Sequence, residues 1–263
     1  MNGVTIYGIV LRYLYIYRRS VPRLIEMLFW PTMDLLVWGF LTVYMTQLSG
    51  SPKITFLIGA MIFWDILYRS AQGVSISFLE DIWARNTLNV FVAPVRISEF
   101  IVATYVVGFL KTSFIVLILS GLAVAIYDFH LTRLGLALIP LFANLMVMGW
   151  AIGMITMALI MRYGQGVEAL AWGIPFLIQP FAAVFYPLEV LPPWMQAVGS
   201  WMPATHAFEG MRQVIADPGS FPMELFLRAA GLNVLWLVGA GVLTWVLYQS
   251  ARREGHLAKF GTL

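Results

Sequence analysis

Six long apolar stretches, separated by short polar joints, occupy almost the whole chain. Hydrophobic residues make up 60% of the 263 residues and charged residues only 11%, whereas a soluble domain carries about a quarter charged residues. Lipid is therefore expected to be the main solvent. A helix crosses the hydrocarbon core with ~20 apolar residues, whereas a barrel strand needs ~10 in alternation. The stretches are too long for strands and predict an all-α membrane protein, a single domain over residues 1–263.

Six transmembrane helices are predicted from these stretches. They cover residues 24–45, 54–78, 100–126, 134–161, 167–186 and 226–248. Ahead of them, residues 1–23 are expected to form a helix in the cytoplasmic interface, because Arg12 interrupts a short apolar run that is rich in tyrosine. The alternative is that this helix simply extends the first span.

The distribution of basic residues predicts the orientation. With both termini in the cytoplasm, eleven of the sixteen Lys and Arg residues lie on or near the cytoplasmic side, four lie outside, and Lys111 falls within a span. Cytoplasmic loops of membrane proteins carry such an excess. The sequence therefore predicts a multi-pass protein with a cytoplasmic N-terminus and C-terminus.

The joint after the second span, residues 79–96, has a mixed-charge start, an apolar run and then Pro94. Ile82, Arg85 and Asn89 recur at helical spacing, which predicts a short amphipathic helix on the cytoplasmic surface that stops before the proline. Such a helix is a place where another protein can push. A plain connector is the alternative.

Residues 187–212 are apolar but too rich in proline to span. Irregular backbone at membrane depth is tolerated only where protein or water surrounds it. We therefore predict a re-entrant helical hairpin that dips into the outer leaflet before the last span and forms an extracellular gate, with Pro187 and Pro192 bracketing its turn. Glu209 and Arg212 are three residues apart and can pair on one helical face.

Three charged residues, Asp34, Asp65 and Lys111, fall near the middle of predicted spans. A charge there costs about 2.5–3.5 kcal/mol on insertion scales, so each needs a partner or water. Asp65 can pair with Arg69 within its own helix, and Lys111 is predicted to pair with Asp34 across the first and third spans. Contact with substrate and a proton relay are the alternatives.

Two patches carry a resemblance to a known family. One runs from Arg85-Asn86-Thr87-Leu88 to Ala93-Pro94-Val95, and the other includes Tyr186-Pro187, Leu191-Pro192, Trp194, Pro203 and the stretch from Glu209 to Arg212. With the six-span layout, the chain resembles the membrane permease subunits of type-2 ABC exporters, which export drugs, polysaccharides and lipids. Asn86 stands where that family commonly has a glycine before Thr-Leu.

The resemblance implies a dimer of permeases, here a homodimer, in a bacterial inner membrane, with a cytoplasmic ATP-binding-cassette ATPase bound to each half. The substrate would pass between the halves. The resemblance also implies two sets of site residues. Those that couple to the ATPase are Glu80, Asp81, Arg85, Leu88 and Pro94, and those of the extracellular gate are Pro187, Pro192, Trp194, Pro203, Glu209 and Arg212.

Other sites are not expected on this chain. It has no phosphate-binding G-x-x-x-x-G-K-[ST] loop, so ATP would act through the partner subunit and the chain itself would bind no cofactor. It has no cysteine and three dispersed histidines, which makes a metal site improbable, and its weak net charge of +3 does not indicate nucleic-acid binding.

Two other classes of function stay open. One is a proton-coupled secondary transporter, for which the sequence offers few buried carboxylates and no visible inverted repeat. The other is a membrane enzyme, for which Ser200 and His206 are the nearest Ser/His pair, without a G-x-S-x-G motif around the serine. We therefore expect a transport subunit and not an enzyme.

Overall fold

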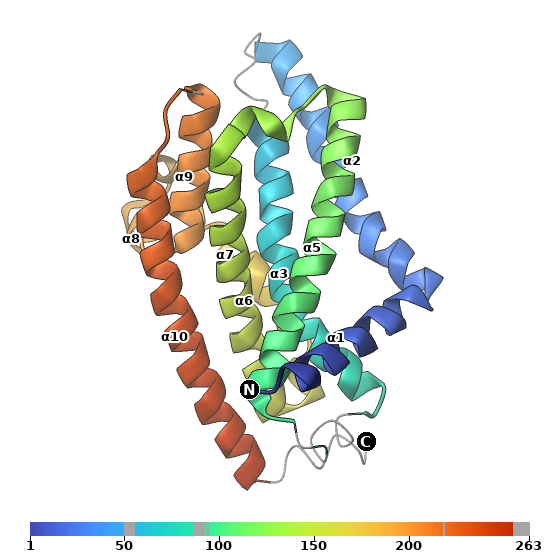
Figure 1. Cartoon of the computed structure of the whole chain (residues 1–263). Coiled ribbons are helices and arrows are strands. Elements are labelled where there is room, and N and C mark those ends of the chain that lie inside the picture. Colours follow the sequence, from blue (N-terminus) through green and yellow to red (C-terminus); the bar gives the residue numbers. More distant parts are fainter. Residues whose placement is uncertain (50–55, 87–92, 94, 218, 255–263) are drawn as a thin grey trace.

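The computed structural model describes residues 1–49, 56–86, 93, 95–217 and 219–254. These residues form nine α-helices joined by turns and three short 3₁₀ segments. Long helices run roughly alongside one another, and one helix lies across the end of the bundle where the N-terminus is found (Figure 1). The all-α prediction is confirmed for the described residues.

The helices have the following bounds, in chain order. They are α1 Gly3–Arg18, α2 Val21–Ser49, α3 Phe56–Trp83, α5 Ile97–Tyr127, α6 Leu138–Tyr163, α7 Leu170–Ile178, α8 Pro193–Gly199, α9 Pro203–Ala216 and α10 Met223–Arg253; the 3₁₀ segments are η2 Leu131–Ala137, η3 Gln165–Val167 and η4 Leu188–Val190. Helix α1 is the one that crosses the end of the bundle (Figure 1). It is separate from α2, in agreement with the predicted N-terminal helix.

Four helical stretches are long and apolar enough to cross a membrane. They are Val21–Leu48, Ile97–Tyr127, Leu131–Tyr163 and Met223–Arg253. Each contains one of the six predicted spans completely and extends slightly beyond it at both ends. Helix α3 has 28 residues and lies among the other long helices, but polar residues such as Asp65, Arg69 and Glu80 lower its hydropathy.

The predicted span 167–186 is not a continuous helix. Helix α7 has only nine residues, Leu170–Ile178, or about 13 Å at 1.5 Å per residue, which is less than half of the hydrocarbon core. Pro175 lies inside α7 and Pro180 follows it, and proline removes helix hydrogen bonds. After irregular residues, α8 and α9 continue the chain to the end of the bundle where α10 begins (Figure 1).

Helix α3 is the centre of the bundle, and most of its residues are buried. It meets α6 at Gly149 and Gly153, where an added β-carbon would lie 2.5 Å from the carbonyl oxygens of Leu67 and Ala71, respectively. It meets α5 at Gly73, where a β-carbon would lie 2.6 Å from the Cα of Gly108. Small residues allow such close backbone contact in membrane proteins.

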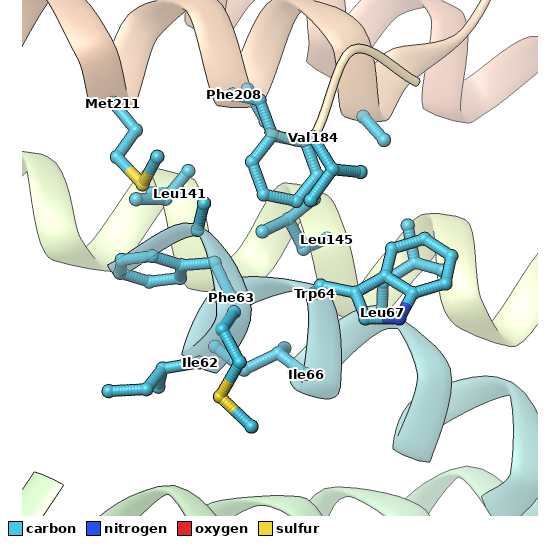
Figure 2. Close-up of a cluster of buried hydrophobic side chains, with 14 of the residues drawn as sticks. Ile62, Phe63, Trp64, Ile66, Leu67, Leu141, Leu145, Val184, Phe208 and Met211 are labelled. Atoms are coloured by element: carbon cyan, nitrogen blue, oxygen red, sulfur yellow. The ribbon is translucent and has the colours of Figure 1, made fainter. Parts of the chain in front are cut away.

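The main apolar core joins α3 to α6 and α9. In Figure 2, Phe208 and Met211 extend from α9 toward Leu141 and Leu145 of α6, and Phe63 of α3 lies near them. All five side chains are fully buried. The core therefore ties the short helix α9 to the centre of the bundle.

Polar and aromatic contacts fix the outer helices. The buried amide of Asn233 on α10 donates to the side-chain oxygen of Asn144 on α6 at 2.9 Å. Tyr127, at the end of α5, packs on Gly39 of α2 and donates to the carbonyl of Leu36 at 3.1 Å. Interhelical hydrogen bonds of this kind are a main source of association in lipid.

Candidate functional site

A polar cluster joins the N-terminal helix to the end of α3. We call it the α1–α3 cluster and define it as Arg12, Tyr13, Tyr17, Glu80 and Asp81. One carboxylate oxygen of Asp81 accepts hydrogen bonds from Arg12 at 2.7 Å and from the Tyr13 hydroxyl at 2.8 Å. Glu80 accepts one from the Tyr17 hydroxyl at 2.6 Å. The acidic pair at the end of α3 therefore holds α1.

Burial keeps the two tyrosines protonated. Desolvation, followed by the negative charge of Asp81, raises the pKa of Tyr13 well above its usual value. Desolvation and the charge of Glu80 also raise the pKa of Tyr17. Both hydroxyls are therefore hydrogen-bond donors throughout the physiological pH range.

Two further cations approach this cluster. Arg23, near the start of α2, lies 3.6 Å from Glu80. The ammonium of Lys111 on α5 lies 3.7 Å from the ring centroid of Tyr17, which places it in a cation–π contact. The cluster therefore connects four helices, α1, α2, α3 and α5, at one end of the bundle.

The structure places the predicted coupling residues in different settings. Glu80 and Asp81 belong to the last turn and a half of α3, and not to a separate surface helix as predicted. They contact the chain's own N-terminal helix. Arg85 is exposed and has a positive φ of 52° just beyond α3. Leu88 and Pro94 lie outside the described residues, as does most of the predicted amphipathic helix. Contact of any of them with an ATPase stays a prediction.

The α1–α3 cluster yields a test. Replacing Asp81 by leucine removes the acceptor of Arg12 and the shorter of the two hydrogen bonds of the Tyr13 hydroxyl, which also reaches the carbonyl of Ser77 at 3.0 Å. A buried donor without a partner costs about 1–3 kcal/mol. We expect a lower melting temperature and faster tryptic cleavage after Arg18 and Arg19, because α1 detaches.

The matched control for that test is Glu26→Leu. Glu26 is exposed on α2 and acts on Tyr17 of the cluster only through its charge, because it takes part in no hydrogen bond or ion pair with another described residue. It should leave both the melting temperature and the cleavage rate unchanged. Equal rates for Asp81→Leu and the native chain would show that the cluster does not hold α1.

A second group of charges lies within the bundle. Asp65 and Arg69 form the predicted pair, with Arg69 Nε 3.1 Å from Asp65 Oδ1. Asp65 Oδ2 is buried and accepts no hydrogen bond from a described residue. The predicted Asp34–Lys111 pair is not formed: Asp34 is exposed on α2 and acts electrostatically on Asp65 and Arg69, whereas Lys111 lies at the α1–α3 cluster.

The predicted gate is held by a pair on α9. Glu209 and Arg212 form the expected ion pair at 2.8 Å. The same Glu209 oxygen accepts the backbone N–H of Leu188 at 2.8 Å, and Arg212 donates to the carbonyl of Val184 at 3.3 Å. The pair therefore holds the irregular stretch between α7 and α8 at two points, Val184 and Leu188.

The prolines and Trp194 lie around this stretch. Pro187 and Pro192 precede η4 and α8 respectively, and so lie on either side of η4. Trp194 is 62% exposed and makes an edge contact with Phe181, whereas Pro203 is buried at the first position of α9. The depth of this segment in the membrane, and its action as a gate, stay predictions.

Sequence reasoning missed two features of the same stretch, one aromatic contact and one unusual backbone conformation. Trp38 of α2 stacks on Phe185, with ring centroids 4.2 Å apart and planes inclined by 11°. Ala183 has a positive φ of 51°, an uncommon conformation for a residue with a β-carbon. The sequence pattern gives no signal for either, since one depends on how α2 is placed and the other on the local bend.

Within the described part of the chain, no three His, Asp or Glu side chains lie together in a way that could hold a metal ion. Ser200 and His206 do meet, but His206 Nε2 contacts the backbone oxygen of Ser200 at 2.9 Å and not its hydroxyl. The Ser200 hydroxyl donates to the carbonyl of Ala197. This geometry gives no activated serine.

Comparison with known proteins gives a distant relationship. No protein-family model matches the chain. It is 26% identical to ABC transporter G family member 20 of Dictyostelium discoideum over an alignment of 206 residues, which covers 76% of the chain. The chain spans about a quarter of the length of that relative (26%), and it is similar to the relative's membrane region.

Proposed function

We propose that this chain is the membrane subunit of an ABC-type exporter and is powered by a separate ATPase. The observation that carries this proposal is the similarity to an ABC transporter over 76% of the chain, combined with a helical bundle that has four candidate spans. The described residues form this bundle, and the 263-residue sequence contains no phosphate-binding loop. In this proposal ATP hydrolysis takes place on the partner.

In this proposal, α3 also crosses the membrane, α7, the irregular stretch and α9 together make the fifth crossing, and α10 makes the sixth. The start of α1 and the end of α10 then lie on the same side, which would be the cytoplasmic side of a bacterial inner membrane (Figure 1). The stretch held by Glu209 and Arg212 would be the extracellular gate. Irregular backbone at that depth is acceptable because protein surrounds it.

The exposed face of α2 supports a second copy as partner. Trp30, Val37 and Tyr44 on this face are each about 60% exposed, and the charged residue Asp34 lies among them. A charged side chain facing lipid at mid-span is costly and normally faces protein or water. A homodimer in which α2 of each copy borders a shared path would give Asp34 such an environment.

The α1–α3 cluster suggests how motion would be transmitted. Arg12 and Tyr13 of α1 bind Asp81 of α3, and Lys111 of α5 lies against Tyr17. An ATPase that pushes on residues just beyond α3 would therefore displace α1, α3 and α5 together. Because α3 packs backbone to backbone on α5 and α6, the displacement would reach the centre of the bundle.

The proposal is tested by co-expression of the tagged chain with an ATPase encoded beside it in its genome. We expect the two to purify together and the ATP hydrolysis rate of the ATPase to change when the chain is bound. Arg85→Glu, at the cytoplasmic end, should weaken the complex, whereas Arg133→Glu, exposed at the opposite end, should not. Uphill transport by the isolated chain, driven by a proton gradient without nucleotide, would instead support a secondary transporter.

A further inference from the structure

Carboxylates and aromatic rings come together where α2 and α7 pack against α3 within the membrane region; Asp34 and Phe176 are exposed there, whereas Trp64 and Asp65 are buried beneath them. We call this part of the molecule the acid–aromatic face; its residues are Asp34 of α2, Trp64, Asp65, Tyr68 and Arg69 of α3, and Phe176 of α7. Helix α2 packs against α3, and the charge of Asp34 acts across this packing on Asp65, Arg69 and Tyr68.

The charges on this face do not balance. Arg69 is already engaged by Asp65 at 3.1 Å and by Gln72 at 3.4 Å. Asp34 has no ion pair or hydrogen bond among the described residues, and the second oxygen of Asp65, a residue only 4% exposed, has no hydrogen-bond partner there. When both carboxylates are ionised, they outnumber the one guanidinium and give a formal charge of −1 per copy, at a depth where an uncompensated charge is costly and a bound cation would offset it.

The aromatic side chains of the face lie beside these charges. Phe176 is 5.2 Å from Tyr68 and 6.4 Å from Trp64 between ring centroids, and it is 52% exposed. The guanidinium of Arg69 lies over the Tyr68 ring at 5.6 Å, which shows that this ring already accepts a cation. Aromatic faces together with carboxylates are the usual means of binding organic cations.

We propose that the acid–aromatic face binds a cationic group of the transported substrate, so that the exporter selects lipophilic cations or cationic amphiphiles. This inference rests on the proposed function, because it places the face on the path between two copies. Two copies would present two excess negative charges to the path. Those charges would repel an anionic substrate, and Arg69, the one cation of this face, is already paired with Asp65.

Binding of tetraphenylphosphonium to the purified full-length chain in nanodiscs of neutral lipid tests the site without the ATPase. Tetraphenylborate has nearly the same shape and the opposite charge. We expect Asp34→Asn to weaken the binding of the cation about tenfold, because a nearby counter-ion is lost, and not to weaken that of the anion. Arg69→Gln should strengthen the binding of the cation.

Two further variants separate recognition from folding. Asp128→Asn makes the same chemical change at an 87% exposed carboxylate beyond α5, and it should bind like the native chain. Phe176→Ala removes an exposed ring and should weaken the binding of the cation about threefold.

Cation binding that is equal in Asp34→Asn and the native chain would overturn the proposal, and so would a parallel loss for both probes. These results say nothing about the partner. Failure to find an ATPase complex would remove the proposed function while leaving a measured cation site in place.

Discussion

Replacement of Gly153 by leucine is expected to abolish accumulation of the folded protein. A β-carbon at this position would lie 2.5 Å from the carbonyl oxygen of Ala71 and 2.8 Å from the β-carbon of Val74, both on α3. Those atoms belong to a helix backbone and to a branched side chain, and neither can rotate away. Overpacking a core costs about 1–3 kcal/mol, and here the two central helices would have to separate, so we expect a larger loss.

A series of glycine variants gives the measurement. Gly153→Ala should already lower the melting temperature, and Gly149→Leu should fail like Gly153→Leu, because its β-carbon would meet the carbonyl of Leu67 at 2.5 Å. Gly121→Leu on α5 and Gly239→Leu on α10 have open space at the β-carbon and serve as controls. Size-exclusion profiles and melting temperatures in detergent report the outcome. A monodisperse, equally stable Gly153→Leu protein would show that α3 and α6 do not pack as described.

The amino-acid sequence predicted well what depends on a single helix. Hydropathy located four stretches that the structure confirms as candidate spans. The pairs Asp65–Arg69 and Glu209–Arg212 followed from spacing along one helix, and both are formed. In each case the helix period alone places the two side chains on one face, so knowledge of the neighbouring helices was unnecessary.

Predictions that needed the placement of two helices were less successful. Asp34 and Lys111 lie on different helices, and their pairing was wrong because Lys111 is at the level of Tyr17 on α1. The α1–α3 cluster was missed for the same reason, since Arg12 and Asp81 are 69 residues apart. Its only signal was the presence of several Tyr and Arg in one short helix beside a bundle with few acids.

The predicted fifth span shows a different limit. Hydropathy favours a continuous crossing from 167 to 186, but helix continuity depends on backbone hydrogen bonds that Pro175 and Pro180 cannot donate. The chain leaves the helix after Ile178 and bends at Ala183. The two prolines signalled an interruption of the helix. The position of α9 beside the interrupted segment depends on the contacts of Glu209 and Arg212, which the sequence pattern does not reveal.

The contacts of Glu209 predict a large loss of stability when this residue is replaced. Replacing Glu209 by leucine removes the acceptor of both Arg212 and the Leu188 backbone N–H. Each unsatisfied group costs about 1–3 kcal/mol when it is buried, and both side chains here are mostly buried. We expect a clearly lower melting temperature and rapid chymotryptic cleavage near Phe185 and Tyr186. Glu224→Leu, in an exposed pair with Arg228, is the matched control and should change little.

Exchange of the two charges distinguishes a positional role from a simple ion pair. In the double variant Glu209→Arg/Arg212→Glu, opposite charges remain three residues apart and can still attract each other. However, the arginine would face the Leu188 N–H, which is also a donor, and the glutamate would face the Val184 carbonyl, which is also an acceptor. We therefore expect the exchange to fail to restore stability or resistance to cleavage. Full recovery would mean that the pair acts through its mutual attraction alone and that its two backbone contacts do not hold the segment between α7 and α8.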